Sequence, residues 1–370
     1  MTEPTLEQFM IMLGLTLLLA QSSQPIRPDT AFSERICSAC RVALKTVVAL
    51  GAAGDTAGDF ADTQILRVSA AGNFYLPKIT YRDRIVIYDR AGAFLRSVRF
   101  DSLGEGNIGT TYLGSKDSVF IFNNGRSQLV HVDATKGPSV VSAFPGSVYS
   151  ALRLGDGRWV VNGVFRTPRT LGLPLHILTR SGVIQSFGSR TREHRPDRPF
   201  EGWRHVLRAS SGEVLSLSYT DPTIERWTTK GEYKGSLSLK LPEFLKPRSG
   251  QSRWSETVPP YSVIEDAKLG SDGLLWLIVT TAAPSWKSAI RSVASPDGGM
   301  PLPVDWQTAL SSWIIVVDEE TGDTVLAARF NEYLRQFVSD SYVSALRGRP
   351  NAQQTLSILS IESVLPTRKK

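Results

Sequence analysis

A repeated pattern of short strands and glycine-bearing turns runs through most of this sequence. Each of four similar segments is an apolar and basic strand that ends in a tight polar turn: 65–72 (ILRVSAAG), 151–157 (ALRLGDG), 206–212 (VLRASSG) and 267–273 (AKLGSDG). A looser fifth copy spans 112–122. A second strand follows each turn and is rich in β-branched and aromatic residues, which suit a pleated, half-buried surface. The pattern therefore predicts a series of β-hairpins.

A second kind of hairpin alternates with the first. Each of its strands is followed directly by another glycine-bearing turn, and these strands are 85–89, 129–133, 176–179, 224–227 and 313–318. Each unit thus holds four strands and two hairpins, and units recur every ~40 to 70 residues. This period predicts an all-β fold, a six-bladed β-propeller with four-stranded antiparallel blades. The nearest candidate for a helix is short, at 331–337.

The ends of the repeat predict how the ring closes. A sixth unit extends from Phe337 to Leu365 and supplies inner strands at 341–346 and 355–364, but no outer strand follows them. The strand-like segment Arg41 to Leu50 precedes the first complete unit and has no partner nearby. We expect it to complete the last blade, since closure protects the strand edges of a propeller. The propeller is expected to span 37–366 as one domain.

The fifth unit carries an insertion at about 282–308 that is dense in Pro, Gly and Ser and contains Trp286 and Trp306. Loops of this length are usually functional or disordered. We expect a surface flap of unknown purpose, and the alternative is a lid that contacts a ligand.

The first twenty residues have the profile of a signal peptide. The apolar run 9–20 (FMIMLGLTLLLA) is followed by polar residues, and it is shorter than the roughly 20 residues that span a bilayer as a helix. Glu3 and Glu7 precede it without any Lys or Arg, which departs from the usual export signal. We therefore expect a signal peptide at 1–20, a flexible linker at 21–36, a periplasmic or extracellular location, and no stable membrane span after signal removal.

Cys37 and Cys40 are the only cysteines. In an exported protein such a pair is expected to form a structural disulfide. A redox pair would need a βαβ setting, which the sequence lacks, and haem attachment would need a histidine where Arg41 stands. Zinc would need further Cys or His ligands nearby.

The formal charge of +7 comes from scattered residues, not from the Lys/Arg blocks of nucleic-acid arms, so we expect no nucleic-acid partner. Several basic residues nevertheless fall in predicted loops: Lys78, Arg82, Arg126, Arg166, Arg169, Arg190, Arg192, Arg195, Arg198 and Arg204. Arginine suits carboxylate or phosphate by bidentate geometry. We therefore predict an anionic ligand, a glycan or a peptide, at the channel mouth, with Arg82, Arg126, Arg166, Arg169 and Arg204 as its contacts. Glu193, Asp197 and Glu201 lie among these arginines and could instead neutralise them.

Particular phrases of the first blade resemble a known family. They are 46–51 (TVVALG) after a cysteine, 84–89 (RIVIYD) with Gly92 and 94–98 (FLRSV), and the glycine-rich 104–107. In these the chain resembles the exported bacterial six-bladed β-propeller proteins related to NHL-repeat proteins. The family's Gly-Pro-Gly-Glu loop is replaced here by Leu103-Gly104-Glu105-Gly106, which puts any function tied to that loop in doubt.

Enzymes built on related propellers include lactonases and an amidating lyase, which use a bound metal. Asp221, Glu265 and Asp266, with Asn123 and Asn162, could converge on Ca²⁺, although their spacing fits turn and capping roles equally well. His131 and His176 fall in third strands and are expected to pack, while His194 and His205 flank a loop, so a three-histidine zinc site is disfavoured. No linear enzyme motif is present. The leading prediction is a non-catalytic binding propeller for an unknown small molecule, glycan or protein, without a cofactor unless it is Ca²⁺. The alternative is a metal-dependent hydrolase or lyase.

Overall fold

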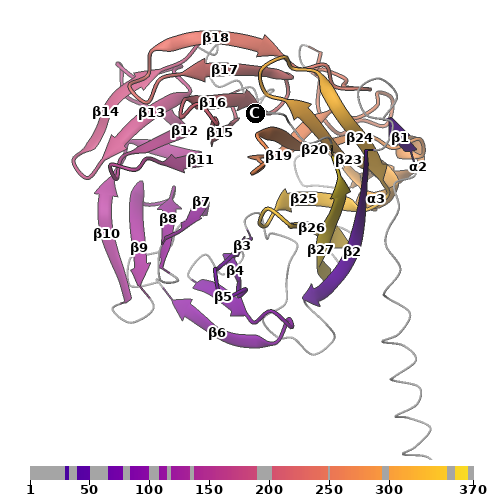
Figure 1. Ribbon diagram of the computed structural model, residues 1–370, viewed down its shortest axis with the longest axis horizontal. Helices are drawn as coiled ribbons and strands as arrows, with labels where there is room; N and C mark the ends of the chain where they lie inside the picture. Colours follow the sequence, from indigo (N-terminus) through magenta and orange to yellow (C-terminus); the bar gives the residue numbers. More distant parts are fainter. Residues whose placement is uncertain are drawn as a thin grey trace, which may run out of the picture.

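The computed structural model describes residues 30–32, 40–50, 66–77, 84–99, 108–114, 118–133, 137–189, 202–248, 251–293, 300–347 and 355–365. These residues form antiparallel sheets that stand side by side in a ring around a central channel (Figure 1). Six of the sheets are blades with four core strands each. The fold is therefore the six-bladed β-propeller that the repeat predicts.

The strands follow one another outward in each of the first four blades. Blade 1 contains β3 (Arg67–Val68), β4 (Phe74–Pro77), β5 (Arg84–Tyr88) and β6 (Phe94–Arg99). Blade 2 contains β7 (Ile108–Leu113), β8 (Val119–Asn123), β9 (Gln128–Asp133) and β10 (Gly137–Ala143). Blade 3 contains β11 (Gly146–Arg153), β12 (Trp159–Phe165), β13 (Leu175–Thr179) and β14 (Gly182–Phe187). Blade 4 contains β15 (Arg204–Arg208), β16 (Val214–Ser218), β17 (Thr223–Trp227) and β18 (Tyr233–Ser238).

The last two blades draw on distant parts of the chain. Blade 5 contains β19 (Val263–Leu269), β20 (Leu274–Ala282), β23 (Leu310–Asp318) and β24 (Thr324–Phe330). Blade 6 contains β25 (Tyr333–Phe337), β26 (Tyr342–Arg347), β27 (Thr355–Val364) and the early strand β2 (Arg41–Leu50). The first-named strand of every blade is the inner strand, which lies nearest the channel in Figure 1.

Ring closure follows the prediction in its main feature. β2 pairs antiparallel with β27 from Arg41 opposite Val364 to Leu50 opposite Leu356, so the start of the propeller supplies the outer strand of the last blade. The start of that blade differs from the prediction, because β25 begins at Tyr333 and occupies the segment considered for a helix. Both Tyr333 and its neighbour Leu334 are buried, which fits an inner strand covered on both faces.

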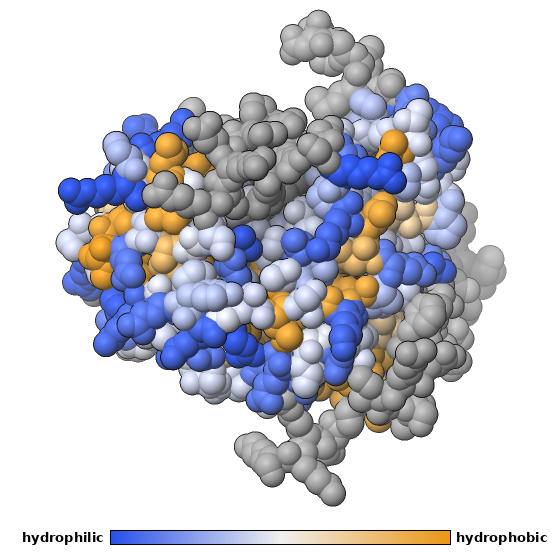
Figure 2. Space-filling view, turned by 90° about the horizontal axis from the view of Figure 1, so that it is seen from above, coloured by the Kyte–Doolittle hydropathy of each residue, from blue (hydrophilic) through white to orange (hydrophobic). Residues whose placement is uncertain are grey.

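The hydrophobic core lies mainly between neighbouring blades. Phe122 of blade 2 packs edge to face on Trp159 of blade 3, with 5.4 Å between ring centroids. Blades 4 and 5 meet through a cluster that includes Leu217 and Ile315. Because each blade is covered on both faces, strands such as β20 and β23 are buried almost throughout, as in other doubly covered sheets. On the face in Figure 2, hydrophobic residues form strips separated by hydrophilic ones.

The insertion in blade 5 has a structure of its own. Between β20 and β23 lie α2 (Trp286–Ala289), β21 (Ile290–Val293), β22 (Met300–Pro303) and α3 (Trp306–Ala309), with β21 and β22 paired as a small hairpin. It leaves and rejoins the propeller where a second strand connects to a third.

The N-terminal predictions fall mostly outside the described residues. Within the segment expected to be a linker, β1 (Thr30–Phe32) pairs with β24 and adds a fifth strand to blade 5. Cys40 is buried, but Cys37 and residues 1–20 lie outside the described residues, so the disulfide and the signal peptide stay predictions. Among the helices that the structure describes, none is long and apolar enough to cross a membrane.

Candidate functional site

One end of the ring gathers two kinds of connection. In an antiparallel blade the link from the second to the third strand lies at the same end as the link to the next blade, because successive strands reverse direction. The observed strand orders impose this arrangement on the blades. We call this end the loop face.

The channel is hollowed at the loop face into a pocket of about 510 Å³, which we call the channel pocket. All six inner strands contribute side chains to it. The residues are Arg67 of β3, Thr110 of β7, Tyr149 of β11, His205 of β15, Asp266 of β19 and Arg335 of β25. Four of them lie in the first half of their strands, the half that starts at the loop face, and Asp266 and Arg335 lie at the midpoints of theirs.

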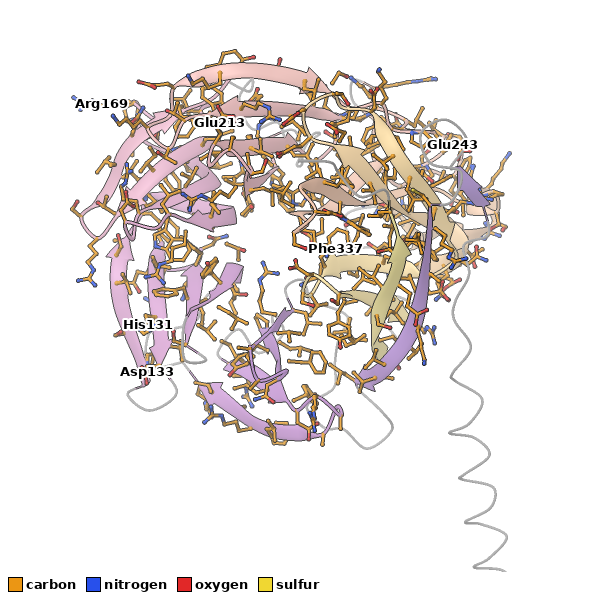
Figure 3. The ribbon with its side chains drawn as sticks, viewed as in Figure 1. His131, Asp133, Arg169, Glu213, Glu243 and Phe337 are labelled. Atoms are coloured by element: carbon orange, nitrogen blue, oxygen red, sulfur yellow. The ribbon has the colours of Figure 1, made fainter. Side chains whose placement is uncertain are left out.

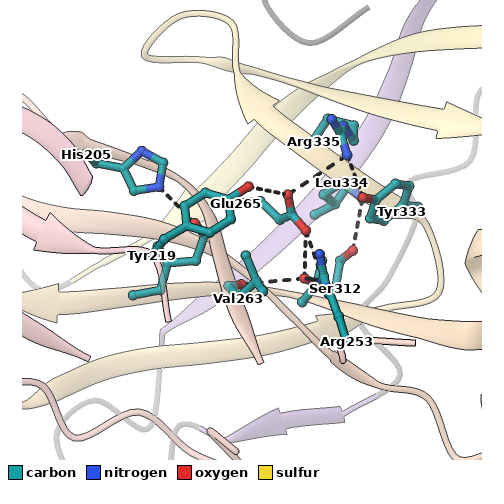
Figure 4. Close-up of polar contacts among 11 residues, drawn as sticks. His205, Tyr219, Arg253, Val263, Glu265, Ser312, Tyr333, Leu334 and Arg335 are labelled. Atoms are coloured by element: carbon teal, nitrogen blue, oxygen red, sulfur yellow. Dashed lines mark hydrogen bonds and ion pairs between the residues drawn. The ribbon is translucent and has the colours of Figure 1, made fainter. Parts of the chain in front are cut away.

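Glu265 lies at the centre of the polar contacts in this pocket (Figure 4). Its side chain is only 4% exposed. Oε1 accepts hydrogen bonds from Arg253 at 3.1 Å and from the Thr280 hydroxyl at 2.9 Å. Oε2 accepts one from the Tyr219 hydroxyl at 3.1 Å and lies 3.9 Å from the Arg335 guanidinium. Both oxygens of this buried carboxylate are therefore already occupied by protein donors.

The electrostatics keep Glu265 ionised. Burial raises the pKa of its carboxyl, but the charges of Arg253 and Arg335 outweigh burial and hold the pKa below its ordinary value. Burial and the Glu265 charge together raise the pKa of Tyr219 well above its usual value, so this phenol stays protonated and can donate. A carboxylate of low pKa is a weak base, and Glu265 is better suited to holding two arginines in place than to transferring protons.

The neighbouring carboxyl of Asp266 behaves in the opposite way. Burial raises its pKa, and the charges of His205 and Arg67 oppose burial without cancelling it. Asp266 Oδ1 lies 3.9 Å from His205 Nδ1, and Oδ2 accepts a hydrogen bond from the Phe337 N–H at 2.7 Å. Burial also lowers the pKa of Arg67, against the opposing charge of Asp266.

A backbone irregularity brings these two acids into one pocket. Successive residues of a regular strand point to opposite faces. The pairing of β19 with β20 shifts between Ile264 and Asp266, so Glu265 has no partner in the register. Such a bulge redirects side chains, and it explains why both Glu265 and Asp266 line the channel pocket.

Aromatic rings form two walls of the pocket. Trp203 stacks on Tyr149 with 4.5 Å between centroids. On the other wall Trp306 stacks on Tyr333 at 5.3 Å and contacts Trp254 at 5.5 Å. Because Trp306 belongs to α3, the blade 5 insertion contributes directly to the channel pocket.

The predicted arginines do not gather in one place. Arg126 and Arg169 line a separate groove between blades 2 and 3. Arg166 is exposed, and its charge opposes the effect of burial, which raises the pKa of Tyr149 in the channel pocket. Arg204 begins β15, where its N–H donates to Asn162 Oδ1 at 3.0 Å. The remaining basic candidates lie outside the described residues: Lys78, Arg82, Arg190, Arg192, Arg195 and Arg198.

The candidate metal ligands are likewise not brought together as a set. Asp221 is paired with Lys246 at 3.0 Å and accepts a hydrogen bond from the Thr223 hydroxyl, and it does not line the channel pocket with Glu265 and Asp266. Within the described ranges, no three His, Cys, Asp or Glu side chains are placed to hold a metal ion. The described residues therefore do not fit a Ca²⁺ site built on these three acids.

The other polar candidates have structural contacts. Asn162 is fully buried, and its Nδ2 donates to the carbonyls of Pro174 and Gly202. His176 is fully buried and stacks on Phe165 at 3.9 Å. His131, labelled in Figure 3, similarly lies on Phe120, with 4.6 Å between ring centroids. His194 lies outside the described residues.

Sequence reasoning missed most of the channel pocket. Arg67, Arg253, Arg335, Tyr219 and Trp203 were not among the predicted contacts. The available signal was positional, because a charged or aromatic residue early in an inner strand faces the channel at the loop face.

The fold and channel define this chain as a six-bladed propeller with a polar, aromatic-walled pocket. No family model and no curated protein matches it. Similar solved structures include a member of the DUF4221 family from Bacteroides vulgatus, with a TM-score of 0.55, 10% identity, and 88% of this chain and 99% of that chain covered.

A gluconolactonase from Xanthomonas campestris is also similar, with a TM-score of 0.51, 10% identity, and 92% and 98% of the two chains covered. So is a catalytically inactive virginiamycin B lyase from Staphylococcus aureus with quinupristin, with a TM-score of 0.50, 10% identity, and 86% and 99% covered. At such low identity these likenesses show the fold alone.

Proposed function

We propose that this chain is a non-catalytic binding propeller that takes an anionic glycan in its channel pocket, and that it works in the periplasm or outside the cell. The observation that carries the proposal is the pairing of clustered arginines with aromatic walls in one hollow. Ligand sites in folds of this kind are expected where several blades contribute residues.

The charges of the described lining favour an anion. Arg67, Arg253 and Arg335 outnumber the two carboxylates of Glu265 and Asp266 in the pocket. Arg335 is the better placed of the two arginines at Glu265 to meet a ligand, because its side chain is 26% exposed whereas that of Arg253 is 10% exposed. A free guanidinium edge can bind a carboxylate in a bidentate manner.

The aromatic walls favour a ring-shaped ligand. Trp203, Trp254 and Trp306 are half-buried and line the pocket. Flat indole faces offer a large contact area with little loss of side-chain entropy, and the apolar face of a sugar ring stacks well on them. A uronic acid combines such a face with a carboxylate.

A calorimetric comparison tests this function. We expect a uronic-acid oligomer to bind at least tenfold more tightly than a neutral oligosaccharide of the same length. Arg335→Gln is expected to remove most of that difference, and Trp306→Ala to weaken both ligands. Arg208→Gln, at an exposed arginine of blade 4 that does not line the pocket, is the matched control. Equal or absent binding of the two oligosaccharides would contradict the proposal, as would binding of an acidic peptide alone.

The alternative of a metal-dependent hydrolase or lyase has a distinct requirement. It would need Asp221 to leave Lys246, and Glu265 to give up contacts with Arg253 and Tyr219. Calorimetric titration with Ca²⁺ compares the two directly. The binding proposal expects the same Ca²⁺ titration curve for the original chain and for Glu265→Gln. Stoichiometric binding abolished by that substitution would favour the enzyme.

A further inference from the structure

A second groove on the loop face lies between blades 2 and 3. Its volume is about 770 Å³, within the roughly 300 to 1,000 Å³ common for ligand pockets. We call it the blade 2–3 groove. It shares no described lining residue with the channel pocket. Arg169, which lines it, lies at the outer circumference of the ring in Figure 3, well away from the channel.

The groove has an apolar surface that nothing in the described chain covers completely. Phe144 is buried at its base and stacks on Phe165 with 5.9 Å between centroids. Val183 is partly buried beside it, and Ile184 is 54% exposed. An apolar ligand lying here would remove part of this surface from water, which is favourable.

The turn that carries Arg126 is held firmly to the next blade. Its first residue, Asn124, donates from Nδ2 to the Val148 carbonyl at 3.1 Å and accepts from the Val148 N–H at 2.8 Å. At the end of the turn the Ser127 carbonyl accepts a hydrogen bond from the Phe144 N–H at 2.8 Å. Ser127 also has a φ of 54°, a conformation that residues other than glycine seldom adopt and that is found often at functional sites.

The turn that carries Arg169 is fixed in a comparable way. Thr170 is buried, and its hydroxyl lies 2.7 Å from that of Thr167 and donates to the Phe165 carbonyl at 3.1 Å. The Arg166 N–H donates to the carbonyl of Pro145 at 3.1 Å, which joins this turn to the connection between the two blades. Both arginines therefore project from backbone that is ordered before any ligand arrives, an arrangement that favours binding.

The described lining of the groove carries charge of one sign. Arg126 and Arg169 are exposed, and neither forms an ion pair with any residue that the structure describes. The described lining contains no Asp or Glu. This distinguishes the groove from the channel pocket, where two carboxylates compete for the arginines.

We propose that the blade 2–3 groove is a second binding site and that it takes a small amphipathic carboxylate. The carboxylate binds Arg126 and Arg169, and the apolar body lies on Phe144, Val183 and Ile184. The site is independent of the channel pocket and does not rest on the function proposed for it.

Decanoate and decanol are suitable probes for the full chain, because they share an apolar body and differ in charge. We expect decanoate to bind, and decanol to bind at least tenfold more weakly, in calorimetry. Arg126→Gln and Arg169→Gln should each weaken decanoate about tenfold. Arg208→Gln and the channel variant Trp306→Ala should leave decanoate binding unchanged, which separates the two sites.

The results that overturn this site are equally specific. They are no decanoate binding, equal binding of decanoate and decanol, or decanoate binding that survives both arginine substitutions. Loss of binding in Trp306→Ala would place decanoate in the channel and also refute the groove. An N-blocked hydrophobic dipeptide with a free carboxyl end is also a small amphipathic carboxylate and serves as a further probe. Its binding beside decanoate, lost with the same two arginine substitutions, supports the proposal.

Discussion

Replacement of Glu265 by glutamine tests whether this residue stabilises the channel. Glu265→Gln keeps the size of the side chain and removes its charge, which leaves Arg253 and Arg335 without their shared carboxylate. Removal of one partner from a buried ion pair destabilises a protein by roughly 3–5 kcal/mol, because the other charge stays buried and unpaired. Arg335 is 26% exposed and can turn toward water. We therefore expect the free energy of unfolding to fall by about 3 kcal/mol, which is the lower end of that range.

The matched control is Glu213→Gln, at a residue labelled in Figure 3. Glu213 pairs with Arg226 at 3.4 Å, but the two side chains are 30% and 20% exposed, and pairs of this kind contribute about 0–1 kcal/mol. Urea unfolding followed by tryptophan fluorescence compares the two variants through the shift of the midpoint at constant slope. Equal losses for the two substitutions, or a loss below 1 kcal/mol for Glu265→Gln, would refute the argument.

The pKa of Glu265 also predicts how the stability of the protein changes with pH. Because the pKa of Glu265 is lower in the folded state than in the unfolded chain, its contribution is present above its ordinary pKa and is lost as the pH falls through the folded value. Asp266 has a raised pKa, so its ionisation opposes folding as the pH rises through that value. Glu265→Gln should therefore flatten the acid side of the stability profile, and Asp266→Asn should stabilise the protein at neutral pH.

Three further predictions concern the scaffold. Burial lowers the pKa of His176 to about 4, so stability should fall between pH ~6.5 and ~4 as the unfolded chain takes up a proton, by an amount on the order of 3 kcal/mol. His176→Phe should remove that slope in urea titrations. Gly92→Ala should lower the free energy of unfolding by about 1–3 kcal/mol, because Gly92 has a φ of +84° and an added Cβ would lie 2.4 Å from Val48 of β2. An unchanged midpoint of thermal unfolding would contradict this expectation. A chain that starts after Leu50 lacks β2 and should aggregate in size-exclusion chromatography, while one that starts at Thr30 stays monomeric, and monomers of both would contradict closure by β2.

The architecture was accessible from sequence because each blade repeats the same local chemistry. Turns such as 209–212 and 270–273 place a glycine of positive φ after a short polar segment, and the flanking strands are apolar enough to be recognised. The closing strand could be inferred because a propeller with one incomplete blade leaves an exposed edge. The start of blade 6 was placed too late, because Tyr333 to Phe337 contains an arginine and a glutamine that point toward the channel, so the strand does not stand out as apolar.

The channel pocket was less accessible for a geometric reason. Glu265 and Arg335 meet across two blades, and Arg253 reaches Glu265 from the long connection between blades 4 and 5. Only the ring brings these positions together. Asp266 and Glu265 were singled out for their charge, but the bulge that turns both into the channel depends on the register with β20, which no residue pattern reveals.

The predicted arginine site was grouped by position along the chain, and the structure places its described members at different distances from the axis. The loops that carry Arg126 and Arg169 share the loop face with the start of β15, which carries Arg204. The alternation of strand directions along the chain predicts at which end of the ring a residue lies. It does not predict how far the residue lies from the axis. Arg204 begins an inner strand, whereas Arg126 and Arg169 follow second strands and line a groove between blades. One expected basic surface is therefore divided into a channel, where three arginines lie beside two carboxylates, and a peripheral groove whose described lining holds no carboxylate. Different ligands should suit the two.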